Sequence, residues 1–285
     1  MAAEKTAWVL AGGGSLGAVQ VGMMKALVAS GQRPDLLVGA SVGAINCAYF
    51  SAYPDADGVE RLSQIWLSLR QQDIFPLSLL GGLRALLMSR DHLIPDEALR
   101  RLIRRALPFE RLEQARVPLH IMTTDLLSGA EVLLSSGPAE PALLASAAIP
   151  AVFPPVHHQG HCLVDGGVAS NAPVSSAVRL GAERVIVLPT GFGCSCPAPP
   201  RGVAPLAMHA LNLLTMRQLV REVEQLHPRI PVSIVPSLCP LDVSVFDFSH
   251  TADLMARSEA LTAEWLAAGG LDQGGVPDAL RPHHH

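Results

Sequence analysis

Charge is scarce in this sequence, and long charged or apolar runs are absent. Charged residues make up 16% of the 285 residues, against 49% hydrophobic residues, a balance that excludes a disordered chain and favours a large buried interior. The formal net charge is -4 and Lys and Arg form no long block, so nucleic acid is not expected as a partner. No apolar stretch reaches the roughly 20 residues that a membrane-spanning helix needs.

Cysteine is scarce as well, and its spacing does not suit a metal site. The five cysteines include no C-x-x-C pair, and their odd number favours a reduced, intracellular setting. The apolar run at 7–11 is too short for a signal peptide. We therefore expect a cytoplasmic protein, with peripheral contact at a membrane surface left open. The histidines at 283–285 are typical of a purification-tag remnant.

Strand-like and helix-like segments alternate along the chain, which predicts an α/β layered fold. Short apolar runs predict strands at 6–11, 36–39, 117–124, 131–134, 163–164, 184–188 and 231–235. Helical spacing predicts helices at 18–30, 42–53, 57–70, 95–107, 141–148, 172–180, 206–226 and 251–268. The stretch 74–112 breaks this alternation, and we interpret it as a helical, cap-like insertion in a single domain of residues 1–282.

The densest group of basic residues is Arg100, Arg101, Arg104 and Arg105. At helical spacing these arginines cover much of one surface. Such a surface fits either a solvated helix face or contact with anionic lipid headgroups. Nearby, the apolar segment 76–88 fits either packed core or a lipid-facing cap.

A glycine-rich turn, Gly12-Gly13-Gly14-Ser15-Leu16-Gly17, follows the first predicted strand and opens the first helix. Its glycines permit positive φ and leave backbone N–H groups uncovered at a helix N-terminus, where negative charge is favoured. The turn therefore predicts a site for an anionic group, either a pyrophosphate or the oxyanion of a reaction intermediate.

The pyrophosphate interpretation meets two obstacles. The dinucleotide fingerprint G-x-G-x-x-G needs an acidic residue at the end of the second strand, whereas Asp35 precedes that strand. A P-loop needs Lys at the position of Ala18. A nucleotide-binding protein without hydrolytic activity therefore stays only as an alternative hypothesis.

The second motif, Gly39-Ala40-Ser41-Val42-Gly43, matches G-x-S-x-G between a predicted strand and a predicted helix. This context is typical of a nucleophile elbow, in which a sharp turn exposes the serine hydroxyl. The helix that begins at Val42 adds N–H donors near the developing charge. Parallel neighbouring strands would bring Ser41 and the glycine turn to the same sheet edge. We therefore expect Ser41 to be a catalytic nucleophile.

A serine nucleophile needs a base, and the sequence offers two kinds. Asp165-Gly166-Gly167 follows a short predicted strand, where the carboxylate can reach a crevice. The order Ser, acid, His of ordinary α/β hydrolases would instead add His209, His227 or His250. None of these histidines lies in a convincing strand-end loop. A small-ester hydrolase with a Ser–Asp–His triad is thus an alternative hypothesis.

Three further histidines, His157, His158 and His161, cluster before Asp165. No cysteine or carboxylate accompanies them at the spacing of metal ligands. We therefore expect no metal site there.

With these elements placed, the sequence resembles the patatin-like phospholipase family from about Thr6 to about Trp265. The resemblance rests on the glycine turn, the G-x-S-x-G motif, Asp165-Gly166-Gly167 with Asn171 and Pro173 beyond, the stretch 145–155, and Phe248-Ser249-His250. It implies a three-layer α/β fold with a mostly parallel central sheet and helices on both faces.

The resemblance also implies the chemistry of a serine esterase that acts on phospholipid, lysophospholipid or acylglycerol, without metal or cofactor. Ser41 would attack the ester carbonyl, Asp165 would accept its proton without a histidine, and water would hydrolyse the acyl-enzyme. The implied oxyanion hole comprises Gly12, Gly13, Gly14 and Gly17, chiefly Gly13 and Gly14, while Gly39, Gly43, Gly166 and Gly167 support the motifs.

The sequence departs from the family at Leu16, where the glycine turn often carries Arg. Any help from that Arg in fixing the turn is absent. Because Ser41 and Asp165 are both present, we interpret the chain as a variant enzyme. These motifs do not encode headgroup, acyl length or oligomeric state.

Overall fold

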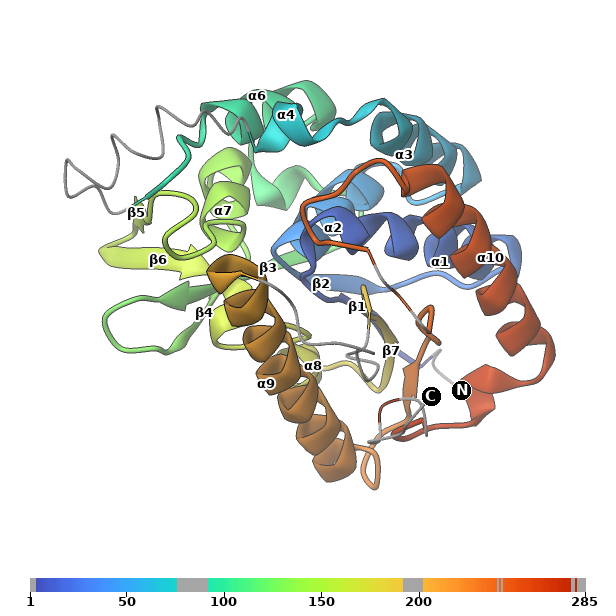
Figure 1. Cartoon of the computed structure of the whole chain (residues 1–285). Coiled ribbons are helices and arrows are strands. Elements are labelled where there is room, and N and C mark those ends of the chain that lie inside the picture. Colours follow the sequence, from blue (N-terminus) through green and yellow to red (C-terminus); the bar gives the residue numbers. More distant parts are fainter. Residues whose placement is uncertain are drawn as a thin grey trace.

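The centre of the molecule is an eight-stranded sheet with the order β5-β6-β3-β2-β1-β7-β8, and β4 pairs with β3 beside this path. The computed structural model describes residues 4–75, 92–191, 202–239, 241, 243–277 and 280. The strands are β1 (Thr6–Leu10), β2 (Leu36–Ala40), β3 (Leu119–Asp125), β4 (Glu131–Leu134), β5 (Val156–His158), β6 (His161–Asp165), β7 (Arg184–Leu188) and β8 (Val232–Ile234). The strands from β3 to β8 along this order pair in parallel, whereas β4, β5 and β6 add antiparallel pairs on one side (Figure 1).

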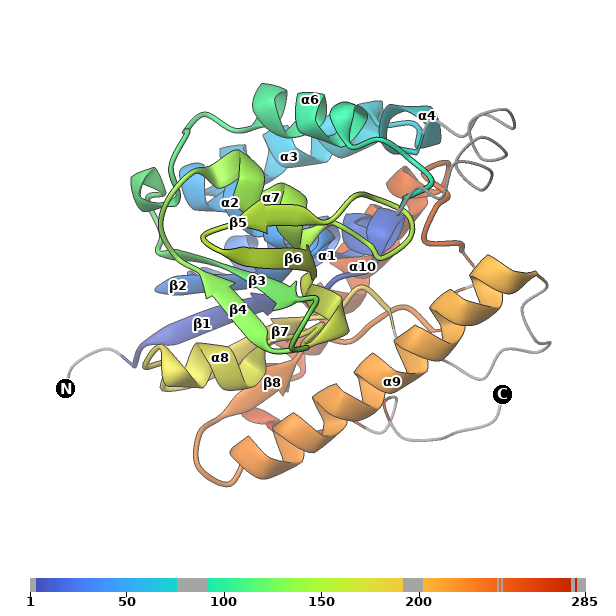
Figure 2. The same cartoon turned by 90° about the vertical axis from the view of Figure 1, so that its left-hand side faces the viewer.

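Helices cover both faces of the sheet (Figures 1 and 2). One face packs against α1 (Gly17–Ala29), α2 (Val42–Ala52), α3 (Ala56–Ser68) and α10 (Thr251–Ala267), and the other against α8 (Val174–Arg179) and α9 (Val203–Leu226). Along β1, Trp8 and Leu10 belong to the first core, whereas Ala7 and Val9 belong to the second. A parallel strand covered on both faces is apolar throughout. The predicted three-layer α/β fold is confirmed.

A further group of helices, α4 (Gln71–Ile74), α6 (Glu97–Ala106) and α7 (Ala139–Ser146), lies beside the first helical layer. Figure 2 shows α4 and α6 above α2 and α7 at the top of the molecule. Helix α6 is the helix predicted for 95–107. The apolar segment 76–88 lies outside the described residues, so the interpretation of 74–112 as an insertion in a single domain stays a prediction.

The arginines of α6 do not form a uniform solvated face. Arg100 and Arg104 both pair with Glu140 on α7, and Arg100 also pairs with Asp96. Arg101 and Arg105 are exposed. Two of the four arginines therefore hold α6 against α7, which corrects the interpretation of all four as one surface for solvent or lipid.

Strand β5 is absent from the sequence predictions because the strand is short and its residues, Val156–His158, are mostly polar. It forms through a tight turn to β6 in which Gln159 and Gly160 both have positive φ, 50° and 83°. Two consecutive positive φ values are the signature of a hairpin turn that matches the strand twist. Tertiary pairing, rather than the apolar pattern, defines this strand.

The cysteines are not all reduced. Cys47 and Cys162 are free, whereas Cys239 is disulfide-bonded. The expectation of reduced cysteines is therefore wrong at Cys239. Among the helices of the described ranges, none combines the length and the apolar character that crossing a bilayer requires.

Helices α1 and α10 cross so closely at Gly22 that a Cβ there would lie 2.1 Å from Ser258 Oγ and 2.2 Å from Met255 O. We expect Gly22→Val to lower the free energy of unfolding by about 2 kcal/mol, because a well-packed helix crossing cannot absorb the added atoms. Urea denaturation measures this change. Ala29→Val, at an exposed position of the same helix, is the control and should stay within about 0.5 kcal/mol of the unsubstituted chain. Equal effects of both substitutions would contradict the close crossing.

Candidate active site

The carboxyl ends of β1 and β2 bring the two sequence motifs together. The strands are parallel neighbours, and Leu10 pairs with Gly39. The glycine turn after β1 and Ser41 after β2 therefore lie at the same edge of the sheet. A Cβ added to Gly12 would lie 3.0 Å from Ser41 Cβ, so the turn is packed directly against the serine. The predicted meeting of the two motifs is confirmed.

Ser41 occupies a strained backbone conformation, with φ 53° and ψ −126°. Such angles are rare for a residue other than glycine and need support from the surrounding structure. Here the Ser41 N–H donates to Ser146 Oγ at 2.9 Å, and the Ser146 hydroxyl donates to Met122 O at 2.7 Å. Ser146 on α7 thus connects the Ser41 turn to β3 through these two hydrogen bonds. No sequence motif indicated this role.

The glycines on either side of Ser41 are required by space. A Cβ at Gly43 would lie 2.2 Å from Leu10 O, and a Cβ at Gly39 would lie 2.6 Å from Ala44 N. Both are contacts with backbone, which cannot move aside. The chain can therefore pass from β2 into α2 beside β1 only if both positions lack a side chain.

Asp165 ends β6 at the level of Ser41, because Thr123 on β3 pairs with Asp165 while Met122 pairs with Ala40. Its Oδ1 accepts a hydrogen bond from Gly167 N at 2.8 Å. Its Oδ2 is buried, with no hydrogen-bond partner of good geometry among the described residues. Of the two carboxylate oxygens, Oδ2 is therefore the one not engaged by a backbone donor.

Burial raises the pKa of Asp165 from 3.8 to about 6, and the Ser41 hydroxyl and the Gly167 N–H group lower it only in part. The Ser41 hydroxyl is therefore close enough to stabilise the carboxylate, although the two side chains do not meet in the strict geometry of a hydrogen bond. A buried carboxylate without a counter-charge is a stronger base than a solvated one. Perturbed carboxyl groups of this kind are typical of catalytic sites.

Only two of the four glycines expected in an oxyanion hole have free N–H groups. Gly12 N donates to Asn171 O at 3.2 Å, and Gly17 N bonds within its own helical turn to Gly14 O. For Gly13 and Gly14, no backbone acceptor exists in the described part of the chain. The structure thus leaves Gly13 and Gly14 as the available donors, beside Ser41.

Asn171 joins the glycine turn to the aspartate turn. Besides the bond from Gly12 N, its Nδ2 donates to Gly12 O at 3.4 Å. Its Oδ1 lies 2.5 Å from where a Cβ of Gly12 would stand and 2.8 Å from where a Cβ of Gly167 would stand. Both positions must therefore be glycine for the asparagine to bridge them.

Other polar contacts hold the glycine turn where the family often has Arg. Thr190 Oγ1 donates to Gly12 O at 2.7 Å, and Ser15 donates through its N–H to Val245 O at 2.8 Å and through Oγ to Ser244 O at 2.9 Å. Leu16, at the family's Arg position, packs into the apolar core instead. The turn is thus fixed by hydroxyl and backbone groups, with no cation at this position.

A buried amide network, also absent from the sequence predictions, links the elements on which the two turns stand. Gln20 Nε2 donates to Ala11 O at 2.8 Å and to Leu188 O at 2.9 Å. Asn46 Nδ2 donates to Gln20 Oε1 at 2.9 Å and to Gly17 O at 3.1 Å, and Trp66 Nε1 donates to Asn46 Oδ1 at 2.9 Å. Both ends of the glycine turn are therefore connected to α2 and α3.

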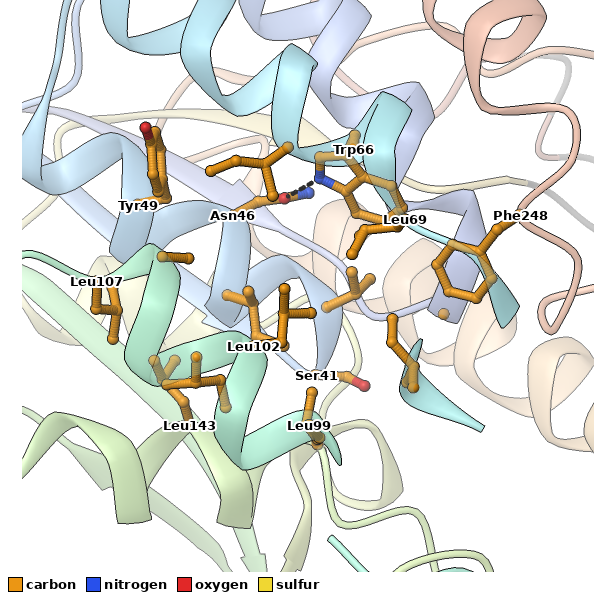
Figure 3. A pocket seen from close by; sticks show the side chains of 18 of the residues that line it. Ser41, Asn46, Tyr49, Trp66, Leu69, Leu99, Leu102, Leu107, Leu143 and Phe248 are labelled. Carbon is orange, nitrogen blue, oxygen red and sulfur yellow. Dashed lines mark hydrogen bonds between the residues drawn. The ribbon is translucent and has the colours of Figure 1, made fainter. Parts of the chain in front are cut away.

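An apolar pocket opens at Ser41 and runs between α2, α3, α6 and α7 (Figure 3). Its empty space is about 820 Å³ when the open solvent at the mouth is included, and about 80 Å³ as a cavity for water-sized spheres; none of its lining residues is charged. In Figure 3, Leu99 lies near Ser41, whereas Tyr49 and Leu107 lie at the far end. The pocket can therefore hold an extended apolar group whose one end reaches the serine.

None of the histidines considered for a triad lines this pocket. His250 faces Asp247 at the start of α10, His227 ends α9, and His209 lies within α9. The described residues contain no group of three His, Cys, Asp or Glu side chains that could hold a metal ion.

Known proteins resemble this chain in sequence and in structure. The sequence is 28% identical to patatin-like phospholipase domain-containing protein 6 of Mus musculus over 187 residues, which are 65% of this chain and 13% of that protein. It is 26% identical to an uncharacterized NTE family protein of Mycobacterium bovis over 286 aligned positions, 90% of this chain and 46% of that protein. The chain thus spans less than half the length of these curated relatives.

Among solved structures, human GIVD cytosolic phospholipase A2 in complex with methyl gamma-linolenyl fluorophosphonate has the same fold, with a TM-score of 0.52 and 13% sequence identity. That alignment covers 98% of this chain and 59% of the human protein. The family model of the patatin-like phospholipases matches residues 8–178, more than half of the chain. This match includes the glycine turn, Ser41 and Asp165, and the chain belongs to the patatin-like phospholipase family.

Proposed function

We propose that the chain hydrolyses acyl ester bonds of lipids with Ser41 as nucleophile and Asp165 as its base, through an acyl-enzyme. The observation that carries this proposal is the placement of a strained serine beside a buried carboxylate, at the mouth of an apolar pocket. The free N–H groups of Gly13 and Gly14 complete the set of groups that acyl transfer needs. Family membership supports the lipid substrate.

In the first half of the proposed reaction, ionised Asp165 takes the proton of Ser41 Oγ as that oxygen attacks the ester carbonyl carbon. The carbonyl oxygen gains negative charge and accepts hydrogen bonds from Gly13 N and Gly14 N, whose dipoles are already oriented and need no rearrangement. When the tetrahedral intermediate collapses, the bond to the alcohol breaks. Asp165 returns its proton to the departing alkoxide, and the acyl group stays on Ser41.

In the second half, water takes the place of the alcohol. Asp165 removes a proton from this water as it attacks the acyl carbon, and the same N–H groups hold the second oxyanion. Collapse breaks the bond to Ser41 Oγ, which recovers its proton from Asp165, and a free fatty acid leaves. A pKa of about 6 suits both tasks, because a base works best when its pKa lies near the operating pH.

The pocket supports an extended acyl chain as the group on Ser41. Two apolar stripes face each other across it, Val42, Ile45 and Tyr49 on α2 and Leu99, Leu102 and Ala106 on α6. Tyr49 stands eight positions beyond Ser41, which corresponds to about 12 Å along a helix. An extended chain covers about 1.2 Å per bond. The stripe on α2 therefore matches an acyl chain of about ten carbons.

Removal of either proposed catalytic group should abolish turnover. We expect Ser41→Ala and Asp165→Asn each to lower kcat/KM for a p-nitrophenyl ester by at least about 10³-fold, because nucleophile and base act as a unit. A fluorophosphonate probe should label the unsubstituted chain and not Ser41→Ala. Ser51→Ala, a buried serine on the same helix, and Asp125→Asn, another buried carboxylate at a strand end, are matched controls that should stay active. Full activity of Ser41→Ala or Asp165→Asn would refute the dyad.

The activity should depend on the ionisation of Asp165. Because the base must be charged to accept a proton, kcat/KM should rise with pH through about 6 and then level off. A pH series with a soluble ester measures this profile. A level profile from pH 5 to pH 8 would rule out Asp165 as the base.

The same carboxyl should cost stability when it is charged. Its folded-state pKa lies above the usual value, so the folded chain keeps the proton longer than the unfolded chain, and stability falls as pH rises from about 4 to about 6. A shift from 3.8 to about 6 corresponds to about 3 kcal/mol. The free energy of unfolding of Asp165→Asn, measured by urea denaturation, should therefore rise relative to that of the unsubstituted chain as the pH is raised from about 4.5 to about 7.5. If the two proteins differ in free energy of unfolding by the same amount at pH 4.5 and at pH 7.5, this result would contradict the raised pKa of Asp165.

The far end of the pocket should set the acyl length. We expect Ala106→Trp, which fills the end near Leu107, to lower kcat/KM for dodecanoyl esters by about tenfold or more, because overfilled apolar sites reject added atoms. Butanoyl esters, which need not reach that end, should be hydrolysed at the original rate. Arg105→Trp adds the same bulk at an exposed position of α6 and serves as the control. An equal loss for short and long esters would mean that this end does not hold the chain.

A further inference from the structure

Helix α9 is packed against the protein along only part of its length. From Met216 onward it contributes to the second core, where Leu219 and Val223 are buried. Gln218 Nε2 donates to Ala169 O at 2.7 Å, just beyond the Asp165 turn. The end of α9 away from β8 runs out past the sheet, as Figure 2 shows. This first half of the helix thus projects from the molecule.

The projecting half exposes large apolar side chains along one face. The exposed fractions are 52% for Leu206, 41% for Leu213 and 65% for Leu214. Positions seven and eight residues apart lie on one helix face. Exposed Ala210 lies between them on this face, and Arg217 and Arg221 continue it. We call these six residues the α9 stripe.

The charges that follow the apolar part of the α9 stripe are Arg217 and Arg221, and exposed Glu224 lies on the same face one turn beyond Arg221. No Asp, Glu, Lys or Arg occurs from 203 to 216, and no acidic residue occurs between Glu183 and Glu222. Arg217 and Arg221 are exposed and have no ion-pair partner among the described residues. An apolar helix face without acidic residues, followed by two arginines, is typical of a helix lying at the interface of an anionic membrane.

The α9 stripe lies on the side of the molecule where Ser41 opens. Helix α9 leads into β8, which is parallel to β7, so α9 begins at the carboxyl edge of the parallel strands. Two other exposed apolar groups lie at this edge, Leu126 and Leu127 after β3 and Val168 after the Asp165 turn. Leu67 at the end of α3 and Leu93, whose N–H donates to Ala151 O, are the other exposed large apolar residues of the described chain, and neither belongs to α9. Apolar exposure is therefore concentrated around the active-site edge.

We propose that the α9 stripe docks the protein on an anionic lipid surface, with Leu206, Leu213 and Leu214 in the acyl region and Arg217 and Arg221 at the headgroups. This inference rests on the proposed function in one respect, that the substrate is a lipid. Docking by this face turns the carboxyl edge toward the bilayer, so that an ester entering the pocket need not cross bulk water.

The test measures vesicle binding without turnover. In the Ser41→Ala background, the full chain is sedimented with vesicles of equal parts phosphatidylcholine and phosphatidylglycerol. We expect Leu206→Gln/Leu213→Gln/Leu214→Gln to lower the partition coefficient by about tenfold or more, because the apolar contribution is lost while glutamine preserves the helix. Leu67→Gln/Leu93→Gln changes exposed leucines outside α9 and is the control, which should retain more binding than the triple variant. Arg217→Gln/Arg221→Gln should weaken binding and reduce its sensitivity to salt.

Two outcomes would overturn the proposal. One is equal vesicle binding by the parent and the triple glutamine variant. The other is a parent that does not bind vesicles but forms a dimer in sedimentation velocity that the triple variant dissociates, since this face would then bind a second copy. With Ser41 restored, the triple variant should hydrolyse a soluble p-nitrophenyl ester at the parent rate. Failure of docking with intact soluble turnover is therefore distinct from failure of the proposed chemistry.

Discussion

The close approach of β1 to the start of α2 is the constraint on which the site depends. Leu10 O occupies the space that a side chain at position 43 would need. The first turn of α2 occupies the space that a side chain at position 39 would need. The chain must therefore reverse sharply between the two glycines, and Ser41 takes a positive φ. The hydrogen bond from Ser41 N to Ser146 helps to maintain this conformation. The packing of the fold thus supplies the strain that points the hydroxyl out of the sheet.

The buried carboxylate of Asp165, like the backbone of Ser41, is held in an unfavourable state by the surrounding structure. A structural aspartate at this depth would be stabilised by a cation or several N–H donors, yet Oδ2 has no partner of good geometry among the described residues. Gly167 N satisfies Oδ1 alone. Burial raises the pKa more than the Ser41 hydroxyl and the Gly167 N–H group lower it, and this is what lets an aspartate replace the histidine of a conventional triad as the proposed base.

Sequence predicted the parts of the fold and site that are locally encoded. The glycine turn, the G-x-S-x-G elbow and the buried parallel strands were found because each depends on adjacent residues. Contacts between distant segments were not found: Ser146 below the elbow, Asn171 between the turns, Glu140 between the α6 arginines, and the pairing that makes β5. Likewise, only the structure shows that the N–H groups of Gly12 and Gly17 are already used.

Neutral groups hold the glycine turn of this chain, in which Leu16 stands where the family often carries Arg. Thr190, Ser15 and Asn171 bind the backbone of the turn, and the Gln20–Asn46–Trp66 network links both of its ends to the pocket wall. Every donor in this set is neutral. In the proposed mechanism such a neutral support leaves the N–H groups of Gly13 and Gly14 as donors to the oxyanion, and no cation of the described residues is among the causes that shift the pKa of Asp165. Burial raises the pKa of the proposed base, and Leu16 belongs to the apolar core beneath the glycine turn.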